Sequence, residues 1–86
     1  MIDEIRQFVL DSLTAMNYSI EDIHDDTALG PAGADLESLA LAELAVRVED
    51  HFGVQFGDDE SETLAGMTVG EFCATVQQRI ASAAAH

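Results

Sequence analysis

Asp35-Leu36-Glu37-Ser38-Leu39 is the stretch around which the sequence is organised, together with the run ALAELAVRVEDHF that follows it at residues 40–52. Residues 30–34 come just before it and are rich in glycine and proline, which favour a turn. Apolar residues in the run recur at steps of three and four, which is typical of an amphipathic helix. Ser38 therefore lies where a loop becomes a helix, a position at which serine is a common N-terminal cap.

The predicted helix over residues 39–52 has two apolar faces. Gly53 is expected to end this helix as a C-terminal cap, with Val54 as the hydrophobic contact beyond it. The second face is off the core stripe, so we expect some of its residues to be exposed; the alternative is that they pack beneath the long loop. The core face is Leu41, Leu44, Ala45, Val48 and Phe52, and the second face is Leu39, Ala42 and Val46.

The N-terminal part of the chain predicts one helix and one long connection. Residues 2–16 are amphipathic, with Asn17 as a stop signal and Arg6 on the water-facing side. The connection over residues 18–34 is long for a small domain, which indicates a functional or anchored loop. Within it, a single helical turn could form at residues 19–22. Its expected apolar anchors are Ile20, Ile23 and Leu29.

The C-terminal part predicts a short helix at residues 60–65 and a longer one after a Thr-x-x-Glu capping box at Thr68 and Glu71. No stretch alternates apolar and polar residues as a half-buried strand does. The sequence therefore predicts a single domain over residues 1–86. Its fold class is all-α: a small four-helix bundle of three main helices and a short third helix, with a long loop between helices one and two.

Charge limits the partners that this chain can bind. The sequence has 3 Lys+Arg against 17 Asp+Glu, for a formal net charge of −14, and it has no lysine. Nucleic acid and anionic membrane surfaces need basic residues, so we exclude both as partners. Basic proteins are favoured, although an acidic surface could also serve only to keep the domain in solution.

The single cysteine, Cys73, is expected to be a small core residue, and we expect a cytoplasmic monomer.

Catalytic and metal-binding motifs are weak in this sequence. A nucleophilic Ser38 would need a general base, yet neither a triad motif nor a Gly-x-Ser-x-Gly elbow is present. The segments 24–26 and 58–60 could hold a divalent cation loosely, but they lack the pattern of a calcium loop, and the histidines do not make a zinc site. We therefore expect neither an enzyme nor a resident metal.

The ordered motifs of the chain resemble the acyl carrier protein family. Leu-Glu-Ser-Leu at residues 36–39, followed by Glu43-Leu44, is similar to the Asp-Ser-Leu and Glu-Leu pattern of that family's prosthetic-group site. The likeness continues at residues 25–29, 49–54 and 67–72, so that it covers nearly the whole chain in the right order. The tetrapeptide alone would be weak evidence, whereas the ordered set is specific.

This resemblance implies a covalent arm on Ser38. The arm would be 4′-phosphopantetheine, transferred from coenzyme A by a phosphopantetheinyl transferase, and its thiol would hold an acyl cargo as a thioester. Partners would be a ketosynthase and other synthase enzymes with basic docking surfaces. Any acyl cavity would lie inside the bundle, between helix two and the loop before it. The recognition residues implied for these partners are Asp35, Glu37, Leu39, Ala42, Glu43, Val46, Glu49 and Asp50.

Four departures from the family pattern bear on the pathway, and the first is that residues 30–34 are richer in glycine than the usual lead-in. Glu37 replaces the usual aspartate, Ala40 stands where many fatty-acid carriers have an acid, and Arg47 interrupts an otherwise acidic helix. They favour a specialised system such as a discrete polyketide synthase, with fatty-acid biosynthesis left open. Two alternatives also stay open: a peptidyl or aminoacyl carrier of the same fold, and an acidic adaptor without a prosthetic group.

Overall fold

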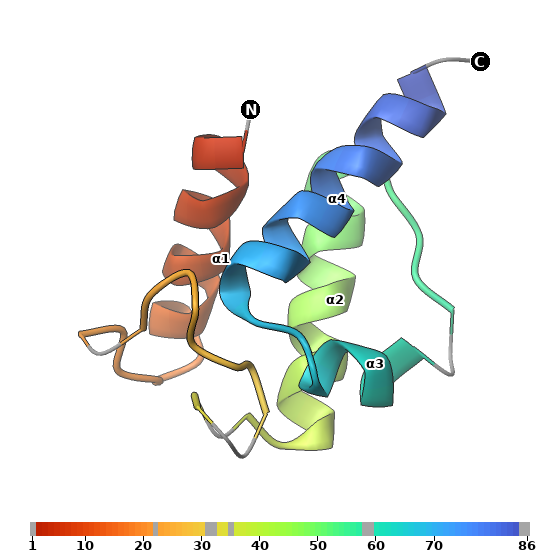
Figure 1. Cartoon of the computed structure of the whole chain (residues 1–86). Helices are drawn as coiled ribbons and strands as arrows, with labels where there is room; N and C mark the ends of the chain where they lie inside the picture. The colour runs from red at the N-terminus through yellow and green to blue at the C-terminus, as the bar shows by residue number, and fades with distance from the viewer. Residues whose placement is uncertain (1, 22, 31–32, 35, 58–59, 85–86) are drawn as a thin grey trace.

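The computed structural model describes residues 2–21, 23–30, 33–34, 36–57 and 60–84, with Ser38 described through its backbone. Its helices are α1 (Ile2–Ala15), α2 (Ser38–Phe52), α3 (Ser61–Ala65) and α4 (Val69–Ala84). α1 packs against both α2 and α4, and the short α3 packs against α2 (Figure 1). Within the described ranges there is no strand, so the predicted all-α bundle is confirmed.

The core is built mainly from apolar side chains of the helices. Ile5, Val9 and Leu13 of α1 are fully buried, and so are Phe72 and Val76 of α4 to within 1%. On α2 the predicted core face is buried except for Phe52, which is half-buried. Burial of such side chains, at about 25 cal/mol per Å² of apolar surface, is the main force that holds the helices together.

The predicted helix ends are confirmed by their backbone geometry. Asn17 has a φ of 69°, and Tyr18 N–H donates to Leu13 O over 2.9 Å, which is the Schellman pattern of a helix C-terminus. Gly53 has a φ of 72° and its N–H donates to Glu49 O. Residues 19–21 form no helix; instead Ile23 N–H closes a turn on Ile20 O, and residue 22 lies outside the described ranges.

The capping box opens α4 as predicted. Thr68 N–H donates to Glu71 Oε1 over 2.9 Å, and Glu71 N–H donates to Thr68 Oγ1 over 3.1 Å. These two bonds satisfy N–H groups that a helix start would otherwise leave unpaired.

The long α1–α2 loop is fixed by backbone hydrogen bonds to the α3–α4 connection. Leu29 N–H donates to Met67 O and Gly30 N–H to Ala65 O, while Val69 N–H donates to Thr27 O. Close approach explains the glycine at position 30, because a Cβ there would lie 2.6 Å from Ala65 O. These bonds attach the described part of the loop to the α3–α4 connection, which lies beside it in Figure 1.

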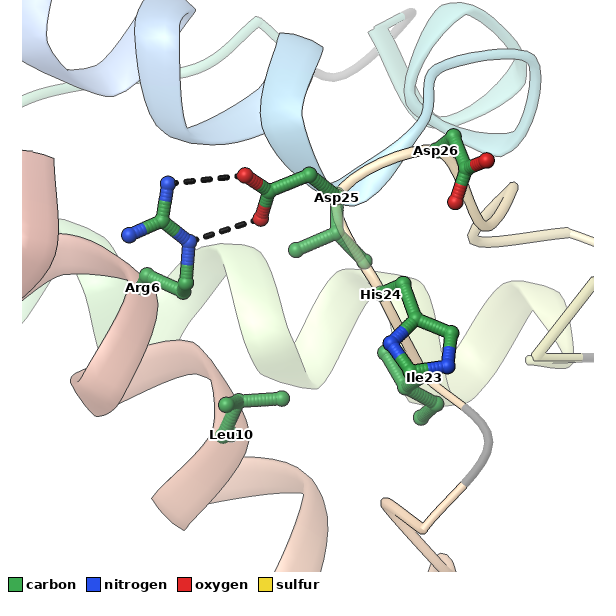
Figure 2. Close-up of a pocket in the computed structure, with 7 residues that line it drawn as sticks. Arg6, Leu10, Ile23, His24, Asp25 and Asp26 are labelled. Atoms are coloured by element: carbon green, nitrogen blue, oxygen red, sulfur yellow. Dashed lines mark hydrogen bonds and ion pairs between the residues drawn. The ribbon is translucent and has the colours of Figure 1, made fainter.

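Arg6, which was predicted to face water, faces it only in part. It is half-buried, and its Nε and Nη2 donate to the two carboxylate oxygens of Asp25 over 2.6 and 2.9 Å (Figure 2). A further bond to Asp3 adds to the effect of Asp25, and together they raise the pKa of Arg6. The sequence did not indicate this ion pair, because the partner lies 19 residues away on the loop that folds back over α1.

Candidate functional site

The start of α2 is the first feature of the candidate site. Glu37 is the N-cap residue, with φ −74° and ψ 162° and no side-chain cap bond, so Ser38 occupies the first helical position. Leu41 N–H donates to Glu37 O over 2.9 Å, which begins the helical ladder. The interpretation of Ser38 as the N-terminal cap is therefore wrong by one residue, because Glu37 occupies the cap position. The predicted exposure of its hydroxyl lies outside the described part of the chain.

A buried leucine fixes the position of this helix start. Leu36 is 3% exposed, and its N–H donates to Leu29 O over 3.0 Å. Leu29 is itself fully buried and bonded to the α3–α4 connection. The backbone two residues before Ser38 is therefore anchored in the core, which leaves little freedom for the helix start to move.

The helix start suits a phosphate ester. The first turn of α2 contains no acidic residue, although the N-cap residue Glu37 just before it is exposed and carries a carboxylate. Its first N–H groups have no carbonyl partner within the helix, and the helix dipole places partial positive charge there. Such an end binds anions, with a contribution of about 0.3–1 kcal/mol when exposed. The residues present therefore fit a phosphate-linked arm at this point.

An exposed apolar face runs along α2 from this helix start. Leu39 is 80% exposed and Val46 is 52% exposed, and Ala42 between them is also exposed. The alternative in which they pack beneath the loop is therefore wrong. The same face borders an open groove of about 770 Å³, whose other wall includes Met16 and Tyr18 at the end of α1.

Two hollows lie beside α2 among the residues that the structure describes, and both are open to solvent. One is the open groove, and the other is a smaller hollow of about 150 Å³ bordered by Phe56 and Leu64. The acyl cavity was expected between α2 and the loop before it, where the side chains of Leu36 and Leu41 are buried.

The predicted recognition acids do not all share one environment. Glu37, Glu43 and Asp50 are exposed, whereas Asp35 lies outside the described residues. Glu49 is half-buried, and its Oε2 accepts a hydrogen bond from Phe56 N–H over 2.7 Å. Glu49 thus ties the α2–α3 connection to α2, a role that sequence spacing did not indicate.

Replacing Glu49 by alanine is expected to lower the free energy of unfolding by about 1.5–3 kcal/mol, because a charge-assisted bond to a part-buried N–H is lost. Asp50→Ala is the matched control, since it is the next residue on the same helix and exposed; it should change stability by less than about 0.5 kcal/mol. Urea denaturation measures both. Equal effects of the two substitutions would contradict this role of Glu49.

The acidic cluster over residues 24–26 is not arranged as a metal site. Figure 2 shows the Asp25 carboxylate turned toward Arg6, whereas His24 and Asp26 do not converge on it. No group of three potential metal ligands occurs among the described residues; Asp58 and Asp59 of the other acidic segment lie outside them.

His51 is stacked on the ring of Phe8 at 4.3 Å, which gives it a packing role.

Cys73 is fully buried in α4, and burial raises the pKa of its thiol from 9.0 to about 11. Two pKa units reduce the thiolate fraction about 100-fold, and the thiolate is the reactive form. We therefore expect iodoacetamide to alkylate the folded protein at least about 100-fold more slowly at pH 8 than the urea-unfolded chain. Mass spectrometry measures both rates, and comparable rates would contradict the burial of this thiol.

Comparison with known proteins bears on this geometry. The model of the family described as "Phosphopantetheine attachment site" matches residues 3–76, which is most of the chain. No curated protein and no solved structure gave a significant match. Among the described residues, no helix is long and apolar enough to cross a membrane.

Domains of this family carry a 4′-phosphopantetheine arm and act as non-catalytic carriers, which interact with phosphopantetheinyl transferases and synthase enzymes. With its helical bundle and its anchored helix start, the chain belongs to the phosphopantetheine-binding carrier family.

Proposed function

We propose that this protein is an acyl carrier whose 4′-phosphopantetheine arm is attached to Ser38, and that residues 1–86 form one carrier domain in the cytoplasm. The observation that carries the proposal is the position of Ser38 at the first residue of α2, two residues after the buried Leu36. This position combines a favourable anion site with a fixed backbone. The acyl cargo would belong to polyketide or fatty-acid biosynthesis.

In the proposed modification, Ser38 Oγ forms a bond to the phosphorus of the pantetheine phosphate of coenzyme A. The pyrophosphate P–O bond breaks, and adenosine 3′,5′-bisphosphate leaves with the bonding electron pair. The hydroxyl proton passes to a base of the transferase. The helix N-terminus would then stabilise the resulting phosphodiester through its free N–H groups.

The protein itself would contribute tethering and recognition. The arm supplies a thiol that holds the cargo as a thioester, and tethering raises the effective concentration of that cargo at each partner enzyme. Leu39, Ala42 and Val46 offer an exposed apolar strip for docking, flanked by the exposed carboxylates of Glu43 and Asp50. We define this set of five residues as the docking strip.

Affinity for a basic ketosynthase is expected to fall as salt rises, because the Debye length shrinks from about 10 Å at 0.1 M to about 3 Å at 1 M. Calorimetric titration across this range measures the effect. The double substitution Glu43→Gln and Asp50→Asn should remove much of the salt dependence. An affinity of the unaltered protein that is indifferent to salt would remove the electrostatic part of the docking proposal.

The proposal is tested by loading. Incubation with coenzyme A and a phosphopantetheinyl transferase should raise the intact mass by one arm. Loaded protein should then accept malonyl groups from an acyltransferase in preference to aminoacyl groups from an adenylating enzyme. Aminoacyl preference would identify a peptidyl carrier, and the absence of any mass gain would leave an adaptor without a prosthetic group.

A further inference from the structure

The three arginines of this acidic chain have different surroundings. They are its only lysine or arginine side chains. Arg6 is bound to Asp25 and Asp3. Arg79 donates to both oxygens of Glu60 over 2.6 and 3.0 Å, and also to a backbone carbonyl. Both of these side chains therefore have a structural role within the fold.

Arg47 has no such partner among the residues that the structure describes. It is half-buried on α2, and its Nε is a buried donor without an acceptor. Glu43 lies four residues earlier and Asp50 three residues later, and both spacings allow an ion pair on a helix. Both acids are exposed, yet neither is paired with Arg47 within the described chain. The fold therefore leaves a positive charge unmatched on α2, although acids stand within reach.

Glu43, Arg47 and Asp50 share one face of α2, because residues four and seven apart lie on the same side of a helix. This face belongs to the docking strip, since Arg47 borders the open groove together with Leu39 and Val46. Along it the side-chain charge is negative, then positive, then negative. The three charges span about 10.5 Å of helix, at about 1.5 Å per residue.

The inner and outer parts of the Arg47 side chain differ in their access to water. Nε is the buried and unpaired atom of this side chain; the two Nη groups are not buried in this way, so they reach solvent. A stem that is held by burial has less freedom to lose when the outer groups bind a partner. Arg47 therefore presents a permanently charged donor in a position that is already fixed.

A uniformly basic partner surface would fit this face poorly. Glu43 and Asp50 attract basic side chains, whereas Arg47 between them repels such side chains. A carboxylate of the partner, placed between two basic groups, removes the repulsion and can accept from both Nη groups of Arg47. A second copy of this chain could also supply a carboxylate, but two chains of formal net charge −14 repel each other.

We propose that Arg47 binds an aspartate or glutamate of the ketosynthase that receives cargo from this carrier, and that this carboxylate lies between basic side chains that face Glu43 and Asp50. This inference rests on the proposed carrier function and adds to it the charge pattern of the partner. Arg47 is then a residue that selects partners: it favours a ketosynthase with this carboxylate and disfavours one whose docking surface is entirely basic.

Arg47→Met distinguishes the two kinds of partner by the sign of its effect. The probe is a ketosynthase that takes an acyl group from the loaded protein, and calorimetric titration measures its affinity. We expect the substitution to weaken binding at least about tenfold, because an ion pair at the interface is lost. An entirely basic surface would instead bind this variant more tightly. Unchanged or tighter binding overturns the inference, and urea denaturation of the variant checks that it is folded.

Cross-linking locates the carboxylate with a variant that keeps the charge. The sequence has no lysine, so Arg47→Lys introduces a single one. A carbodiimide then joins the new amine to a carboxylate in contact with it; an amide bond forms, and the reagent takes up the released water as a urea. Asp50→Lys is the matched control, because Asp50 is exposed on the same face but should lie opposite a basic group.

Peptide mass spectrometry of the cross-linked samples reads out the result. We expect the amine at position 47 to be joined to an aspartate or glutamate of the ketosynthase at least about tenfold more often than the amine at position 50. Equal cross-linking of the two variants, or none to the ketosynthase, overturns the inference. A cross-linked pair of carrier chains also overturns it, because Arg47 would then serve self-association.

Intact mass of the unaltered protein reports attachment of the arm separately. A chain that gains no arm, or a loaded chain that no ketosynthase binds, refutes the carrier function and with it this inference. A loaded chain that the ketosynthase binds equally well after Arg47→Met refutes the inference alone.

Discussion

Ser38→Ala is expected to abolish arm attachment completely and to leave the helical fold intact. The substitution removes the one hydroxyl to which the proposal assigns the phosphodiester. The N-cap residue is Glu37, so the variant loses no cap, and alanine is the best helix former. Intact mass after incubation with coenzyme A and a transferase measures the attachment, and circular dichroism measures the fold.

Ser19→Ala is the matched control for that substitution. Ser19 is exposed on the α1–α2 loop, so that a transferase could reach its hydroxyl without help from the fold. This variant should gain one arm as fully as the unaltered protein does. A mass gain that survives in Ser38→Ala, or one that is lost in Ser19→Ala, would contradict the assignment.

Phe72→Ala is expected to reduce the free energy of unfolding by about 3–5 kcal/mol, through lost burial and the cavity left behind. Phe72 is 1% exposed and stacks on Phe56 with ring centroids 5.8 Å apart, so that it joins α4 to the α2–α3 connection. Domains of this size have a total stability of roughly 4–13 kcal/mol. The variant should therefore lose a large share of its stability, measured by urea denaturation.

Phe72→Leu separates the size of the side chain from its aromatic contact. Leucine keeps most of the apolar volume, and the loss should then be well below that of the alanine variant. A Phe72→Ala protein with an unchanged urea midpoint would show that this ring does not hold α4 in place.

Local signals predicted the helices and their ends. Three-and-four periodicity gave the amphipathic α1 and the core face of α2, and short-range chemistry gave the ends at Asn17 and Gly53. The capping box at Thr68 was also predictable, because both partners lie within four residues. These features depend on residues close in sequence, which is why the sequence sufficed.

Contacts between distant residues were not predictable in this way. The ion pairs of Arg6 with Asp25 and of Arg79 with Glu60 each span 19 residues. The hydrogen bonds between the α1–α2 loop and the α3–α4 connection join backbone atoms, so no side chain in the sequence marks them. The glycine at position 30 reflects one of these contacts, because a side chain there would collide with Ala65. The sequence indicated a glycine-rich turn at residues 30–34 before α2, but it did not indicate that Gly30 lies against Ala65.

The candidate site was predicted in part. Exposure of Leu39 and Val46 follows from their place off the core stripe and is confirmed. The bond between Glu49 and Phe56 was missed, because the same spacing fits an exposed acid. Attachment at Ser38 and the recognition roles of the acids stay predictions. Arg47 was noted as an interruption of the acidic helix, but its unpaired donor became visible only in three dimensions.

The central claim is that the arm is carried by the first residue of α2, and locating the arm in the unaltered protein tests it most directly. Cleavage after arginine divides the chain into peptides 1–6, 7–47, 48–79 and 80–86, and serines 12, 19 and 38 share the second of these. Fragmentation of that peptide by electron transfer resolves them. We predict one phosphopantetheine group, on Ser38; an arm on any other residue, or none on the loaded chain, would contradict the account.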